Sequence, residues 1–410
     1  MKNKKLLVLY PDTFIWEQDK KTLMYNCTSK RTYLFDAVPP IDNYCHKLKD
    51  IQNLYVEKIS EQDMENSVMK EWLQQVVDKK MGFIKEQEEG KSHIISFPPV
   101  LNLQSDVDRI EKQEGRDIGE YAAQNWNECT LFMGGESEHP QMYKQLHYPV
   151  DYNGHLDFYA LQRFFRGADH SYLHTINLVG DVFSYPYKAE LMDMLYSMSA
   201  KKHFYLTEAC ATQFIEEIKA LDLKNYELHI YCEGYGKPDG IHQELKAGNI
   251  PFQWVYLLSD EAQTEELGQL ETLYGEENIE VRPVFTGENF DFFENNIYLT
   301  EEDIMHPDCD KQDVFAHQVM NTNFWGRLSI LPDGHVYSNL NLPPLGNLED
   351  RLYDLIVDEM KSHRAWRWTR DEITPCKDCL FRYLCPSPSN YEFVIGKNNL
   401  CHIKKKVERR

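Results

Sequence analysis

Four cysteines near the C-terminus are the residues whose types and spacing most clearly predict chemistry. A Cys-x-x-Cys pair is followed after five residues by a third cysteine and after fifteen more by a fourth, and the set is Cys376, Cys379, Cys385 and Cys401. A Cys-x-x-Cys turn points two thiolates at one ion, and two more complete the tetrathiolate that zinc or an iron-sulphur cluster requires. We therefore predict one metal or iron-sulphur site here.

The four thiolates alone do not identify the metal, because tetrathiolate sites hold both zinc and iron-sulphur clusters. Two other interpretations are weaker. Four reduced structural thiols would be unusual, since Cys-x-x-Cys seldom occurs without metal or redox chemistry. A thioredoxin-like redox pair would need a βαβ pattern around it, and the flanking sequence has none. In a reducing compartment, grouped cysteines also favour metal binding over disulfides.

The composition of the chain predicts a globular cytoplasmic protein. Its 410 residues exceed the roughly 100 to 200 of one domain, so two or three domains are expected. The net charge of −22 would repel a phosphate backbone, which argues against a nucleic-acid partner. No stretch approaches the ~18 apolar residues of a membrane span, and the apolar run at residues 6–10 is too short for a signal peptide, so we expect no membrane partner.

Residues 1–91 predict a small winged-helix-like module. Three short antiparallel strands are expected at residues 6–10, 14–16 and 23–25, and a helical stretch near residues 32–35. The spacing of Met69, Trp72, Leu73 and Val76 is typical of an amphipathic helix, which we expect over residues 68–77.

Residues 92–300 alternate between β-rich runs and amphipathic helices, which indicates a parallel sheet. Six units are too few for a closed eight-stranded barrel, so an open, partial barrel is expected. The six strands are predicted at residues 129–134, 174–180, 203–207, 226–232, 252–258 and 279–285.

Residues 301–410 predict a hairpin, a helix and the cysteine-rich end of the chain. The turn at residues 331–334 joins strands at 328–330 and 335–337, and a helix is expected over 349–361. Here the segments PDGHVY (332–337), PLGNL (344–348) and PCKDC (375–379) resemble a SPASM domain, the C-terminal extension of many radical SAM enzymes that mature peptides.

This resemblance implies an α/β fold: a partial (β/α)6 radical-SAM-like barrel between the N-terminal winged-helix-like domain and a SPASM-like domain. In the family, two auxiliary 4Fe-4S clusters are typical. One would use Cys376, Cys379, Cys385 and Cys401, so one 4Fe-4S cluster is implied, with zinc as the alternative. Asn339 and Ser389 occupy places where the second cluster needs cysteines, so we expect it to be absent.

Radical SAM enzymes also need a CxxxCxxC motif after the first barrel strand, and this chain lacks it. No cysteine lies between Cys129 and Cys210, and residues 179–182 replace the glycine-rich SAM motif with VGDV. Without three thiolates there is no cluster to cleave SAM reductively, so neither SAM nor any catalytic residue is expected. The chain, including residues 385–392, is most similar to pseudo-radical-SAM/SPASM proteins that accompany GG-type peptide precursors in Bacteroidales.

The N-terminal module resembles the recognition element of ribosomal-peptide (RiPP) maturation, which binds the leader of a precursor peptide. Binding there occurs by strand addition, so the resemblance implies peptide-binding roles for the predicted third strand and helix. The residues concerned are Leu23, Met24, Tyr25, Met69 and Trp72. The alternative is that the helix residues are core, as in any three-helix module.

These observations together predict a non-catalytic accessory protein in the maturation of a ribosomally synthesised peptide. It would bind the precursor leader and partner a true radical SAM maturase. The alternative is an iron-sulphur enzyme that uses its cluster for electron transfer, or its barrel for SAM-independent peptide modification.

Overall fold

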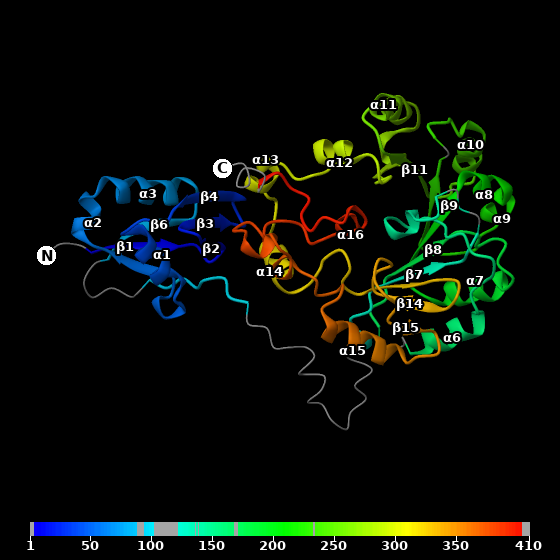
Figure 1. The fold of residues 1–410 in the computed structure, drawn as a ribbon, viewed down its shortest axis with the longest axis horizontal. Coiled ribbons are helices and arrows are strands. Elements are labelled where there is room, and N and C mark those ends of the chain that lie inside the picture. The colour runs from blue at the N-terminus through cyan, green and yellow to red at the C-terminus, as the bar shows by residue number, and fades with distance from the viewer. Residues whose placement is uncertain are drawn as a thin grey trace, which may run out of the picture.

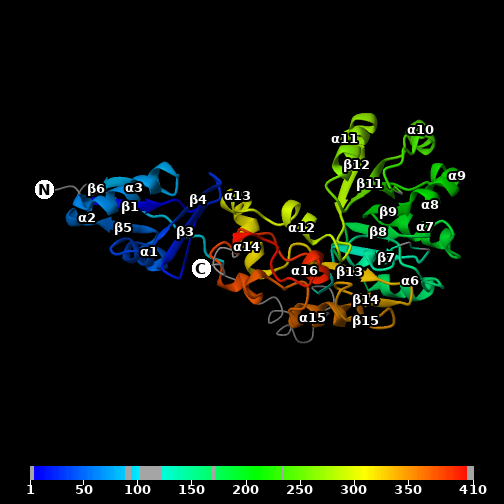
Figure 2. The same cartoon turned by 45° about the horizontal axis from the view of Figure 1, so that its top comes forward.

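Three regions follow one another along the long axis of the molecule (Figures 1 and 2). The N-terminal module lies at one end, a large sheet with its helices at the other, and the C-terminal region between them. The computed structural model describes residues 4–87, 94–101, 122–135, 137, 139–167, 171–232 and 234–403.

The six strands of the N-terminal module form two antiparallel sheets, ordered β5-β1-β6 and β2-β3-β4. The strand predicted at residues 6–10 therefore lies in a different sheet from the next two. The strands are β1 (Lys4–Leu9), β2 (Thr13–Gln18), β3 (Lys21–Asn26), β4 (Arg31–Asp36), β5 (Val56–Ile59) and β6 (Gly82–Gln87).

The predicted helix near residues 32–35 is wrong, because this segment is strand β4. Its side chains alternate between two apolar clusters: Tyr33 and Phe35 pack toward the helices, and Leu34 packs on the opposite face. A run that is apolar on both faces lacks the polar alternation that marks a half-buried strand, so its sequence does not separate strand from helix. This segment is a strand because it pairs with β3 along its whole length.

The module's helices are α1 (Ile41–Lys49), α2 (Glu61–Glu65) and α3 (Ser67–Asp78). The amphipathic helix predicted at residues 68–77 is present as α3. It begins at Asn66, whose side chain accepts hydrogen bonds from the main-chain N–H groups of Val68 and Met69. Its buried face lies over the core that both sheets share.

The large sheet has nine strands in the order β12-β11-β10-β9-β8-β7-β13-β14-β15. Strands β7 to β12 are neighbours in sequence order and run parallel, which confirms the predicted βα alternation. Their bounds are β7 (Glu128–Phe132), β8 (Thr175–Val179), β9 (Lys201–Thr207), β10 (Tyr226–Tyr231), β11 (Phe252–Leu258) and β12 (Ile279–Pro283).

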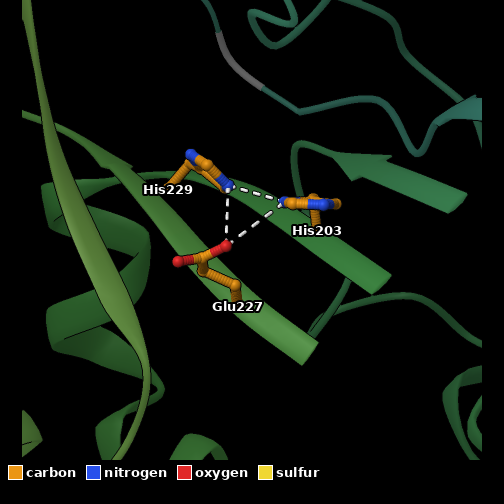
Figure 3. A group of neighbouring side chains, drawn as sticks. All are labelled: His203, Glu227 and His229. Carbon is orange, nitrogen blue, oxygen red and sulfur yellow. Dashed lines mark hydrogen bonds and ion pairs between the residues drawn. The ribbon is translucent and has the colours of Figure 1, made fainter. Parts of the chain in front are cut away.

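One face of this sheet carries the helices and the largest core. Leu228 and Ile230 of β10 point into it, whereas their neighbours in sequence point to the opposite face. That opposite face carries polar side chains, among them His203, Glu227 and His229 (Figure 3). The helices are α6 (Phe158–Arg166), α7 (Lys188–Ser197), α8 (Glu208–Gln213), α9 (Ile215–Lys219), α10 (Asp239–Ala247), α11 (Gln263–Tyr274) and α12 (Phe290–Asn296).

The C-terminal region contributes the predicted hairpin to the large sheet. Strand β13 pairs in parallel with β7, and β14 and β15 extend the sheet antiparallel from it, which the sequence did not predict. Its elements are α13 (Glu301–Met305), α14 (Lys311–Val319), β13 (Arg327–Ile330), β14 (His335–Tyr337), β15 (Gly346–Asn347), α15 (Leu352–Ser362) and α16 (Asn390–Ile395).

The N-terminal module packs directly on the C-terminal region. The Tyr25 hydroxyl of β3 donates to the carbonyl of Cys309 (2.6 Å), and the Thr32 hydroxyl donates to the carbonyl of Met305 (2.6 Å). Lys311 pairs with Asp12 at 2.5 Å. The shared apolar cluster, called the interface cluster below, contains Phe14, Leu23, Tyr25, Cys27, Ile304, Val314, Leu380, Phe381 and Leu384.

Within the described residues, no helix combines the length and the apolar character that crossing a bilayer requires. The domain limits at residues 91 and 300, and the winged-helix and SPASM assignments, stay predictions.

Candidate functional site

The four C-terminal cysteines come from three stretches of chain that meet beside the interface cluster. The short 3-10 turn η5 (Cys376–Asp378) forms the Cys-x-x-Cys knuckle, where the Cys379 N–H donates to the Cys376 carbonyl at 2.9 Å. Cys385 follows a turn closed by its own N–H on the Phe381 carbonyl (3.0 Å). Cys401 forms an isolated bridge with Leu299. Cys379, Cys385 and Cys401 all pack against the interface cluster.

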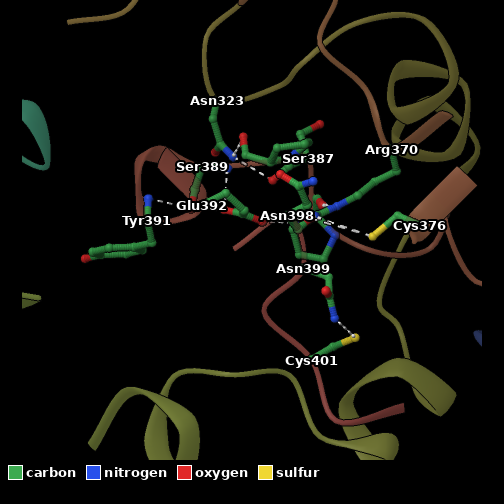
Figure 4. A network of polar contacts seen from close by, with 12 residues as sticks. Asn323, Arg370, Cys376, Ser387, Ser389, Tyr391, Glu392, Asn398, Asn399 and Cys401 are labelled. Carbon is green, nitrogen blue, oxygen red and sulfur yellow. Dashed lines mark hydrogen bonds and ion pairs between the residues drawn. The ribbon is translucent and has the colours of Figure 1, made fainter. Parts of the chain in front are cut away.

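The thiols lie close enough to influence one another electrostatically. Burial raises the pKa of Cys376 and Cys385, and the neighbouring cysteines raise both further. Arg370 acts in the opposite direction, with its guanidinium 3.9 Å from the Cys376 sulfur (Figure 4). Once deprotonated, neighbouring thiolates repel one another, and a bound cationic metal centre offsets that repulsion. This donor set therefore fits such a centre.

The chemistry of this donor set fits either zinc or a 4Fe-4S cluster, because tetrathiolate sites hold both.

A buried ion pair fixes the chain around the cysteines. Arg370 donates to Glu392 at 2.7 Å, and their side chains are only 9% and 2% exposed. Arg370 also donates to the carbonyl of Pro386 (3.0 Å), next to Cys385. Glu392 accepts further hydrogen bonds from the N–H and hydroxyl of Ser389 (2.8 and 2.7 Å). Figure 4 shows this network reaching from α16 to Cys376.

Asn339 and Ser389, which the SPASM resemblance aligns with cysteines of a second cluster, both make polar contacts. Asn339 is buried and donates to the side chain of Asn390 at 2.8 Å. Ser389 forms the capping box of α16 with Glu392. Both side chains therefore have structural roles in hydrogen bonding.

The segment after β7 packs inside the mouth of the parallel sheet. Met142, Tyr148 and Val150 form one apolar cluster with Phe132 of β7 and Tyr231 of β10. Gln145 of the same segment donates to the Phe285 carbonyl (2.8 Å) and accepts from the Phe285 N–H (2.9 Å). The described residues of this segment thus serve as packing residues of the sheet's mouth.

A cavity of about 1210 Å³ lies near the carboxyl ends of the parallel strands. It is lined by this same segment and by strand-end residues that include Asp181, Thr207, Cys210, Cys232 and Ser259. Burial raises the pKa of Cys210 and of Cys232 to about 12, so both thiols stay protonated near neutral pH.

The residues predicted to bind a peptide lie in the interior of the protein. Leu23, Met24 and Tyr25 have no exposed surface, and Met69 and Trp72 are at most 1% exposed. The expectation that β3 offers a free edge is wrong, because β3 is the central strand of its sheet. The alternative interpretation of Met69 and Trp72 as core residues agrees with their burial.

One cluster of chemically active side chains was missed in the sequence. His203, Glu227 and His229 each place a potential ligand atom within 4.8 Å of the others. The Glu-Leu-His alternation in β10 signals that Glu227 and His229 share one face of a strand. Their meeting with His203 depends on the register between β9 and β10, which that alternation does not contain.

No protein-family model and no curated protein sequence matches the chain. Among solved structures, it is similar to "Crystal structure of Streptococcus suis SuiB bound to precursor peptide SuiA", with 12% identity, a TM-score of 0.41, and 96% of this chain and 97% of that chain covered. It is also similar to a histidine-tagged anSMEcpe with bound AdoMet, at 12% identity and a TM-score of 0.41, covering 63% of this chain and 84% of that one. Similarity this low supports no argument about function.

Proposed function

We propose that this protein is a non-catalytic accessory protein in the maturation of a ribosomally synthesised peptide. It binds the precursor leader, carries one 4Fe-4S cluster on Cys376, Cys379, Cys385 and Cys401, and partners a true radical SAM maturase. The observation that carries the proposal is the segment after β7, which packs Met142, Tyr148 and Val150 into the mouth of the sheet and contains no cysteine.

Reductive cleavage of SAM needs an iron with an open position, held by three thiolates. The stretch between Cys129 and Cys210 supplies none. The barrel region then serves as a scaffold for the N-terminal module and the C-terminal cysteine site.

The cysteine site supports this role as a structural link. When bound, an iron-sulphur cluster would supply four strong bonds that join the knuckle, the turn before Cys385 and the end of the chain. Cys379, Cys385 and Cys401 border the interface cluster, which includes Phe14 and Tyr25 of the N-terminal module. The cluster ligands would thereby fix the module in place.

Strand β4 is a better place than β3 for a leader to add. In the part of the chain that the structure describes, β4 pairs with β3 alone. The Ala37 N–H donates to the Lys20 carbonyl at 2.7 Å, so the main chain of Ala37 faces β3. Residues of an antiparallel strand alternate between facing the partner strand and facing away from it. Leu34, three residues before Ala37, therefore directs its main-chain N–H and C=O to the open edge of β4. The neighbouring helix α3 exposes Val68 and Val77, which could contact apolar leader side chains.

Replacing Leu34 with proline is expected to weaken leader binding about 10-fold more than replacing it with alanine, because proline also deletes an edge N–H donor and its hydrogen bond. Both variants lose the same packing, so Leu34→Ala is the matched control. Fluorescence anisotropy with a labelled precursor peptide measures the difference. Equal affinities of the two variants would exclude β4 as the reading edge.

Anaerobic incubation of the full chain with SAM and a strong reductant is expected to yield no 5'-deoxyadenosine above the protein-free background. A catalytically competent radical SAM enzyme assayed in parallel confirms that the reductant works. Chromatographic detection of 5'-deoxyadenosine from this protein would overturn the non-catalytic assignment and favour the iron-sulphur enzyme.

A further inference from the structure

We propose that His203, Glu227 and His229 form a binding site for one divalent transition-metal ion, distinct from the cysteine site. The three residues lie on adjacent parallel strands, with His203 on β9 directly opposite Glu227 on β10. His229 lies two residues further along β10, so all three side chains project from the same face of the sheet, opposite the largest core.

The ligand atoms of the three side chains converge. His203 Nδ1 lies 2.7 Å from His229 Nε2, and one oxygen of Glu227 lies 3.8 Å from the first nitrogen and 3.9 Å from the second. Figure 3 shows the three groups pointing toward one another above strands β9 and β10. Two imidazoles and one carboxylate are a donor set that zinc and non-haem iron(II) both accept.

A fourth residue orients the buried histidine as a ligand. His229 is 7% exposed, and its Nδ1 lies 3.1 Å from a carboxylate oxygen of Glu280 on β12. A carboxylate only accepts hydrogen bonds, so Nδ1 carries a proton and Nε2 is the atom that faces His203 and Glu227. Carboxylates behind metal-bound histidines play this orienting role in known metal sites.

Occupation of the site requires only a small rearrangement. Zinc bound at about 2.0 to 2.1 Å by both nitrogens would hold them about 3.3 Å apart in a tetrahedron, so the two rings must separate slightly from their present 2.7 Å. Three protein ligands leave a coordination position for water or another ligand. His203 also lines a cavity of about 480 Å³, whose walls include Asn177, Tyr205 and Arg282, through which an ion could enter.

The competing interpretation is a metal-free network of ion pairs. Lys201 binds the same Glu227 oxygen at 2.6 Å, but its side chain is 50% exposed and can turn into solvent. The other charges nearby are already balanced, since Arg282 pairs with Glu280 and Arg327 lies 3.3 Å from a Glu128 oxygen. A metal therefore competes with one half-exposed lysine, whose ion pair is weak, and with the hydrogen bond between the two histidines.

Metal binding to the full-length protein tests the proposal directly. Wild type and variants are equilibrated with Co²⁺ or Zn²⁺, and bound metal per chain is counted by elemental analysis. We expect His229→Gln and His203→Gln each to bind one equivalent less than wild type. His174→Gln, which changes an exposed histidine just before β8, is the matched control and should bind as wild type does. Glu280→Gln should bind about 10- to 100-fold more weakly.

Two features keep the outcome decisive. The cysteine site contributes equally to wild type and to the histidine variants, so the difference reports the histidine site even if the iron-sulphur assignment fails. Zn²⁺ should also raise the melting temperature of wild type more than that of His203→Gln, whose partly exposed side chain is the safer one to change. Equal metal content in wild type and both folded histidine variants would overturn the proposal and leave a metal-free network.

Discussion

Replacing Cys379 with alanine is expected to abolish iron-sulphur binding and unfold the C-terminal region. Structural metal sites of this kind contribute on the order of 10 kcal/mol to folding, because the metal stands in for a core. Cys379 also borders the interface cluster, so the loss should extend to the contact between β3 and residues 304–315. Iron and sulphide content, with limited proteolysis of the anaerobically purified protein, measures both effects.

Cys309→Ala is the matched control for this change. Cys309 packs against the same cluster, and its thiol lies 3.5 Å from the Leu384 carbonyl, but it is outside the predicted ligand set. It should retain full iron and sulphide and lose only the modest stability of a half-buried thiol. If both variants kept the same iron content, Cys379 would not be a ligand.

Replacing Arg370 with methionine is expected to cost about 3 to 5 kcal/mol of unfolding free energy, because a buried ion pair loses one partner and Glu392 keeps an uncompensated charge. The network that joins α16 to the turn before Cys385 would loosen at the same time. Urea unfolding followed by circular dichroism gives the change in free energy.

Arg163→Met provides the control, since Arg163 pairs with Glu349 at 2.8 Å, both side chains are more than half exposed, and such pairs contribute about 0 to 1 kcal/mol. The double variant Arg370→Met with Glu392→Leu should recover part of the loss, because it removes both buried charges. A double variant as unstable as Arg370→Met alone would show that the unpaired charge is not the cause.

Features that depend on local pattern could be predicted from the amino-acid sequence. The alternation of apolar strands and helices predicted the six parallel strands β7 to β12, because each strand and helix carries its own periodicity. The helix α3 and the hairpin at β13 and β14 followed from the spacing of apolar residues and from the turn between the strands. The spacing of the four cysteines singled out one candidate metal site for the same reason.

Long-range contacts in the folded chain determined three other features: which strand lies at an edge, which sheet each strand joins, and which side chains meet. Strand β4 made β3 central and buried Leu23 to Tyr25, and β13 joined the large sheet beside β7. His203 faces Glu227 because of the register between β9 and β10. These outcomes depend on contacts between residues far apart in the chain, and a residue's own neighbours in sequence carry no information about which distant strand will pair with it.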